Sequence, residues 1–90
     1  MGIALFKIKI LPESQSIDLT SLGENVKKTV EQLGASSTAL EEQPIAFGLN
    51  ALIIGFRINE NIDSSKIEEA ISKITGVSSI QIIDYRRAIN

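Results

Sequence analysis

Carboxylates are the main side chains in this sequence that could do chemistry, because the chain has no histidine and no cysteine. Without them there is no disulfide, no thiol nucleophile, no ordinary zinc site and no side chain suited to proton transfer near neutral pH. The neighbouring acids are typical of a solvated face, namely Glu41–Glu42, Glu68–Glu69 and Glu60 with Asp63. No glycine-rich phosphate loop of standard spacing is present. We therefore predict a protein that is not an enzyme and needs no metal or cofactor.

The most unusual segment is the short apolar run Pro44–Leu49, which leads directly into the apolar stretch 50–58. A tight turn uses Gly and Pro for their backbone properties, and polar residues usually fill the remaining positions. Here Phe47 stands where a solvent-exposed side chain is expected. Two interpretations follow from the residues: Phe47 folds back on the core, or a rigid hairpin tip presents its ring to a partner.

The elements that must position this segment are predicted from hydrophobic periodicity. Strands are predicted over 3–11, 37–43, 49–58 and 77–86. The second is weak and polar enough for a sheet edge, and the third is apolar on both faces, which suits the centre of a sheet. Leucines and valines spaced three and four apart predict a helix that starts at Asp18 and ends at Gly34. A second helix follows Asp63 or Ser64 and ends at Gly76. The order is βαββαβ within one domain, residues 1–90.

This order predicts an α+β, ferredoxin-like fold, with a four-stranded antiparallel sheet of strand order 4-1-3-2 and both helices on one face. Asp84 is expected late in the last strand on the helix side, paired with an arginine or a backbone amide. The other sheet face is expected to be open, as a solvated surface, a docking surface or a homodimer face. It would carry Leu5, Lys7, Lys9, Ala51, Ile53, Arg57, Gln81, Ile83 and Tyr85.

The same topology separates two exposed segments by the length of a strand. The turn that carries Phe47 falls at one end of the sheet, and the tail 86–90 leaves the last strand at the other end. At about 3.3 Å per residue this distance is roughly 20–30 Å. Only a large partner could contact both.

The bulk charge restricts the classes of partner. With a formal net charge of -2 and a pI near 5.0, the chain lacks the basic balance of a domain whose affinity comes from phosphate neutralisation. No apolar run approaches the roughly 20 residues that cross a bilayer, and the first residues do not resemble a signal peptide. We expect a soluble cytoplasmic protein that binds neither nucleic acid nor membrane and is a monomer when free.

Three segments together resemble a known family. The first strand with Leu11–Ser14, the block Glu41–Leu52 and the ending Ile83–Arg87 are similar to archaeal translation elongation factor 1-beta and to the C-terminal exchange module of the eukaryotic factor. The resemblance spans the whole chain, and the aromatic-glycine turn is its most specific part. It implies a ferredoxin-like guanine-nucleotide exchange factor for elongation factor 1-alpha, the GTPase that carries aminoacyl-tRNA.

The resemblance also implies which residues contact that GTPase. By matching positions, Pro44, Phe47 and Gly48 would contact its second domain, and the tail of Arg86, Arg87, Ile89 and Asn90 would face the nucleotide side, where the family perturbs a magnesium site. The eukaryotic module has a lysine next to its C-terminus. Asn90 occupies that position here, so this chain offers no cation there.

Two other functions compete with nucleotide exchange. A ligand-sensing ferredoxin-like domain needs a glycine-rich loop after the first strand, and Ser14–Ser16 is a poor substitute. Single-stranded RNA binding across an open sheet needs two or three aromatic platforms in the central strands. The expected open face offers only Tyr85, near one end of an edge strand.

Overall fold

A computed structural model describes residues 2–88 of the chain. Ile89 and Asn90, expected at the partner-facing tail, lie outside the described residues. The elements are β1 (Ile3–Pro12), α1 (Leu19–Gln32), β2 (Ser36–Pro44), β3 (Asn50–Asn59), α2 (Ser64–Ser72) and β4 (Val77–Ala88), with a single helical turn at Ala46–Gly48 between β2 and β3. The predicted βαββαβ order is confirmed.

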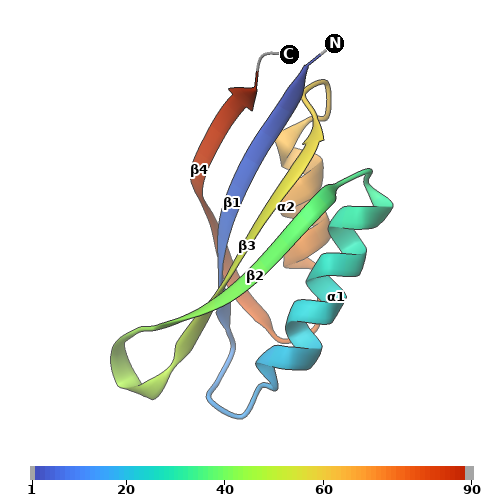
Figure 1. The fold of residues 1–90 in the computed structure, drawn as a ribbon. Coiled ribbons are helices and arrows are strands. Elements are labelled where there is room, and N and C mark those ends of the chain that lie inside the picture. Colours follow the sequence, from blue (N-terminus) through green and yellow to red (C-terminus); the bar gives the residue numbers. More distant parts are fainter. Residues whose placement is uncertain (1, 89–90) are drawn as a thin grey trace.

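The four strands form one antiparallel sheet in the order β2-β3-β1-β4, which confirms the predicted 4-1-3-2 arrangement. Both helices cover the same face of this sheet (Figure 1). The hairpin between β2 and β3 projects from one end, while the start of β1 and the end of β4 lie at the other (Figure 1). The molecule is elongated, with extents of 42 × 20 × 19 Å.

Each helix begins at an aspartate whose side chain caps the first turn. The Asp18 carboxylate accepts a hydrogen bond of 3.0 Å from the Thr20 N–H, and Asp63 accepts one of the same length from the Ser65 N–H. The bond from Ser65 holds the pKa of Asp63 below its usual value, because it stabilises the ionised carboxylate. These contacts satisfy amide donors that have no partner within the helix.

The core lies between the helices and one face of the two central strands. Ile8 and Ile54, paired across β1 and β3, are fully buried there. The helices bury the apolar residues at three- and four-residue spacing against them, Leu22, Val26 and Val30 from α1 and Ile67 and Ile71 from α2. The residues of β1 and β3 that face the core are therefore the ones predicted from the sequence.

A bulge in β4 changes the sheet face on which the later residues of this strand lie. The register with β1 shifts between Lys7 and Ile8, so that Asp84 pairs with Lys7 and Ile82 pairs with Ile8. Ile83 is the extra residue of the bulge, and residues 84–87 lie on the face opposite to the one that strict alternation predicts. The placement of Asp84 on the helix side was therefore wrong. Its predicted pairing is confirmed, at 3.3 Å from Asp84 Oδ2 to Arg86 Nε.

The same bulge moves Tyr85 to the helix side, so its placement on the open face was also wrong. Its ring packs edge-on against Phe6, with centroids 4.9 Å apart, and Phe6 in turn stacks on Phe56 at 5.5 Å. A prediction based on a strict two-residue period cannot detect one extra residue in a strand. No glycine or proline in residues 77–88 marks the bulge in advance.

Two residues on the open face are less accessible than expected. Ala51 and Ile53 are buried although no helix covers this side. They occupy the central strand β3, where Ile53 lies between Lys9 of β1 and Glu41 of β2. Long side chains on flanking strands cover such a position with their aliphatic parts.

Because Ile54 is buried in β3 and Ile83 is exposed in β4, replacing them with alanine should change the free energy of unfolding by different amounts. Ile54→Ala should lower the free energy of unfolding by about 2–5 kcal/mol, because it leaves a cavity in the core. Ile83→Ala, on the exposed bulge, should change it by no more than about 0.5 kcal/mol. Urea denaturation followed by circular dichroism measures both. A large loss from Ile83→Ala would contradict the exposure of this side chain on the open face.

Candidate partner-binding surface

The tip of the β2–β3 hairpin is built from two consecutive residues in the left-handed backbone region. Phe47 has φ 64° and Gly48 has φ 72°. The connection is closed by the Ile45 N–H, which donates to the Leu49 carbonyl at 2.8 Å, and by the Leu49 N–H, which donates to the Ala46 carbonyl at 3.4 Å. The left-handed conformation costs a non-glycine residue about 1–2 kcal/mol.

The Phe47 side chain is 90% exposed, so the interpretation that it folds back on the core was wrong. Burial of the ring within the described structure therefore does not offset its backbone strain. Strained residues of this kind are concentrated at functional sites. The geometry thus favours a ring that is presented to a partner.

The tip is braced by the loop that follows β1. The Gln15 side-chain amide donates a hydrogen bond of 2.6 Å to the Phe47 carbonyl. A Cβ at position 48 would lie 2.8 Å from the same Gln15 nitrogen, so both this close approach and the positive φ favour glycine there. Sequence patterns did not identify Gln15. Only the spatial proximity of two loops 32 residues apart shows its role.

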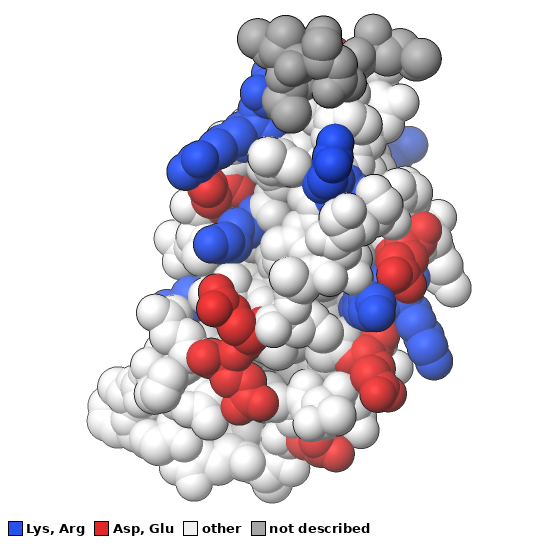
Figure 2. All heavy atoms as spheres, viewed as in Figure 1, with Lys and Arg blue, Asp and Glu red and all other residues white. Residues whose placement is uncertain are grey.

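The hairpin tip is uncharged, and the charged side chains nearest to it are acidic. Residues 43–50 contain no charged side chain. Figure 2 shows this uncharged hairpin with acidic side chains next to it, whereas Lys and Arg lie farther away. An apolar tip with an acidic flank suits a protein partner better than a phosphate backbone.

At the opposite end, Arg87 is held by a carboxylate from the β3–α2 loop. Its Nε and Nη2 donate to Glu60 Oε2 at 3.0 and 2.9 Å. This bond and the negative charge of Glu60 raise the pKa of Arg87. Glu60 can approach because Gly2 has no side chain, since a Cβ there would lie 2.5 Å from Glu60 Oε2. Glu60 was not predicted as part of this end.

The predicted contact residues that the structure describes form two groups. Pro44, Phe47 and Gly48 lie together at the hairpin tip, and Arg86 and Arg87 lie together near the end of β4. The antiparallel register places the two groups at opposite ends of the sheet, with Ile3 opposite both Asn59 and Ala88. No small ligand could contact both.

The open sheet face does not suit RNA binding. With Tyr85 on the helix side, this face carries no aromatic residue among residues 2–88, because Phe6 and Phe56 point into the core and Phe47 lies at the tip. Base stacking on a sheet needs such rings. Among the same residues, no three acidic side chains come together to hold a metal ion, and neither helix is long and apolar enough to cross a membrane.

Comparison with known proteins decides between the remaining interpretations. The family described as the EF-1 guanine nucleotide exchange domain matches residues 5–88. The chain belongs to this family. Elongation factor 1-beta of Methanosarcina mazei is 38% identical over 88 residues, which covers 97% of this chain and 99% of the relative. Elongation factor 1-beta of Sulfolobus acidocaldarius is also 38% identical, over 82 residues that cover 89% and 90% of the two chains.

Membership of the exchange domain family confirms the resemblance inferred from the sequence. Elongation factor 1-beta of Methanothermobacter thermautotrophicus, 35% identical over 97% of this chain and 98% of its own length, agrees with it. The matched residues include the hairpin tip as well as the core. They support a role in guanine nucleotide exchange during translation elongation.

The exposure of Phe47 predicts that its ring contributes nothing to folding. Phe47→Ala should change the free energy of unfolding by no more than about 0.5 kcal/mol, since the substitution removes an exposed side chain and keeps the backbone conformation. Thermal and urea unfolding measure this. A loss of several kcal/mol would show that the ring packs on the protein.

Proposed function

We propose that this protein, acting as a single domain of residues 1–90 in the cytoplasm, promotes exchange of GDP for GTP on elongation factor 1-alpha. The observation that carries the proposal is the strained, braced and almost fully exposed Phe47 in a chain of the EF-1 exchange domain family. The tip would bind one part of the GTPase, and the end of β4 would bind beside its nucleotide site.

The mechanism needs no bond chemistry by this chain. An exchange factor binds the nucleotide-free GTPase more tightly than the nucleotide-bound form, and linkage then requires the nucleotide to bind less tightly in the complex. A thousandfold weakening corresponds to about 4 kcal/mol. Disturbing the magnesium ion of the GTPase, which bridges protein and phosphates, would supply part of this energy.

The two ends have different roles in this proposal. The Phe47 tip, with Pro44 and Gly48, anchors the complex at a distance from the nucleotide. The tail with Arg86, Arg87, Ile89 and Asn90 then acts at the nucleotide side. Both arginines are paired, but Glu60 holds Arg87 by two hydrogen bonds of 2.9 and 3.0 Å, whereas Arg86 has one longer contact, 3.3 Å to Asp84 of its own strand. Arg86 is therefore the more easily released cation.

A direct test is the release of fluorescent GDP from elongation factor 1-alpha in the presence of excess unlabelled nucleotide. Adding this protein should accelerate release in a saturable manner, because the complex binds nucleotide more weakly than the free GTPase. Unchanged release at saturating concentration, with a GTPase that a known exchange factor activates, would rule the proposal out.

Removing the tip ring should weaken the interaction without unfolding the protein. Phe47→Ala should raise the half-saturating concentration for GDP release by about tenfold or more, as expected for an aromatic anchor at an interface. Ile83→Ala provides a control, because it removes an exposed apolar side chain away from both ends. Equal effects of the two substitutions would contradict a specific role for the tip.

A further inference from the structure

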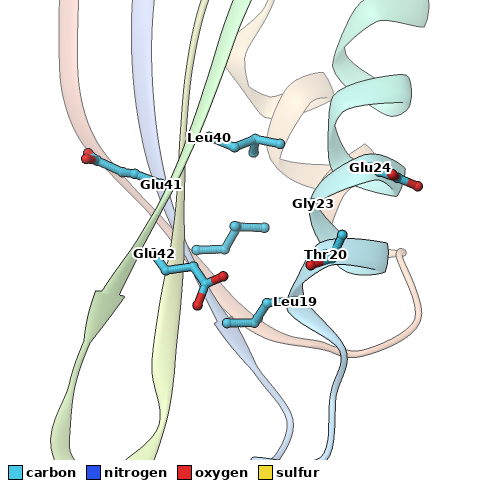
Figure 3. A pocket seen from close by; sticks show the side chains of 8 residues that line it. Leu19, Thr20, Gly23, Glu24, Leu40, Glu41 and Glu42 are labelled. Carbon is cyan, nitrogen blue, oxygen red and sulfur yellow. The ribbon is translucent and has the colours of Figure 1, made fainter.

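An apolar groove runs between the first turns of α1 and the edge strand β2. It has a volume of about 520 Å³, and Leu19, Gly23, Leu40 and Leu52 form its apolar lining. Leu40 is 40% exposed, which makes it one of the few large apolar side chains on the surface. In Figure 3 its side chain points from β2 toward α1 across the groove. Such accessible apolar surface is typical of an interaction site.

The groove depends on a glycine in the middle of a helix. Gly23 lies within α1, where glycine costs about 1 kcal/mol relative to alanine. A Cβ at this position would lie 3.3 Å from Leu40 Cδ1 and 3.6 Å from Leu52 Cδ2. The missing side chain therefore leaves α1 close to the sheet while keeping the apolar wall of Leu40 accessible.

Glu24, Glu41 and Glu42 all line the groove, and one of these carboxylates is directed at its mouth. Figure 3 shows Glu42 pointing from β2 toward Leu19, whereas Glu41 points to the opposite face of the sheet and Glu24 points outward from α1. The register agrees, because Glu42 pairs with the core-facing Leu52 and Glu41 with Ile53 of the open face. Glu42 takes part in none of the ion pairs among residues 2–88, and no Lys or Arg of that range lines the groove.

The groove continues to the hairpin tip. A second, more polar hollow of about 310 Å³ adjoins it and shares three of its lining residues, Leu19, Thr20 and Glu42. The same hollow is lined by Gly48 and Leu49 of the tip and by Gln15, which braces the tip. A partner bound at Phe47 can therefore extend along this side without crossing the sheet.

We infer that this groove binds a segment of the same GTPase in which an apolar side chain is followed closely by a lysine or arginine. This inference rests on the proposed function and adds a third contact to it. The apolar side chain fills the space between Leu19 and Leu40, and the cation pairs with Glu42. Burial of the apolar side chain would contribute affinity, and the ion pair with Glu42 would fix the orientation of the bound segment.

A second copy of this chain is a poorer occupant. Two copies that met at the β2 edge would bring Glu41 and Glu42 of each chain close to the same acids of the other. Like charges at a strand edge oppose pairing. The apolar lining and the three glutamates around it instead complement a basic segment.

The test compares charge reversal at two adjacent positions on opposite faces of β2. Glu42→Lys should raise the half-saturating concentration for GDP release about tenfold or more, because a hydrogen-bonded ion pair becomes a repulsion. Glu41→Lys carries the same change in net charge and should stay within about twofold of the unaltered protein. Glu42→Gln should fall between the two. Unfolding curves confirm that all variants are folded, and titration onto nucleotide-free elongation factor 1-alpha measures binding directly.

The outcomes separate this inference from the proposed function. Equal effects of Glu41→Lys and Glu42→Lys would show that only overall charge matters and would overturn the groove contact. Binding that is sensitive to Glu42, without accelerated release, would support the groove and overturn exchange. No binding by the unaltered protein would overturn both. A dimer detected by sedimentation, abolished by Glu42→Lys alone, would assign the groove to a second copy and overturn the GTPase contact.

Discussion

The pairing of β1 with β3 is the constraint on which the rest of the structure depends. Ile8 and Ile54 meet across these two strands at the centre of the core, and both helices pack against this row. Because β3 is central, its pairing with β2 continues beyond the core as far as Pro44 opposite Asn50. The hairpin is thus an extension of the central part of the sheet, and it holds Phe47 away from the body of the molecule.

The same pairing gives the molecule three distinct surfaces, and we propose that one large partner contacts all three. The tip is apolar and uncharged, the end of β4 carries Arg86 and Arg87, and the α1–β2 side between them has an apolar groove with Glu42 at its mouth. The ion pair between Arg87 and Glu60 links β4 to the β3–α2 loop. The hydrogen bond from Gln15 links the tip to the loop after β1. Each end is therefore held by a contact from a loop distant in sequence.

Local pattern was enough to predict the strands, the helices and their arrangement. Periodicity placed the elements, the capping residues Asp18 and Asp63 marked where helices begin, and the topology followed from handedness and pairing. Prediction failed where one extra residue altered the register: Ile83 bulges out, so Asp84 and Tyr85 exchange faces. The exposure of Phe47 and the roles of Gln15 and Glu60 depend on contacts between distant segments, which no single-sequence pattern encodes.

Simultaneous contact of one GTPase with both ends of the sheet is the central claim. Amide hydrogen exchange followed by mass spectrometry tests it most directly, with the protein free and bound to nucleotide-free elongation factor 1-alpha. We predict protection of both end segments, 44–50 and 84–90, whether or not the groove between α1 and β2 is also protected, with little change over the outer surface of α2. Protection of only one of these segments, or of the open face alone, would contradict the claim.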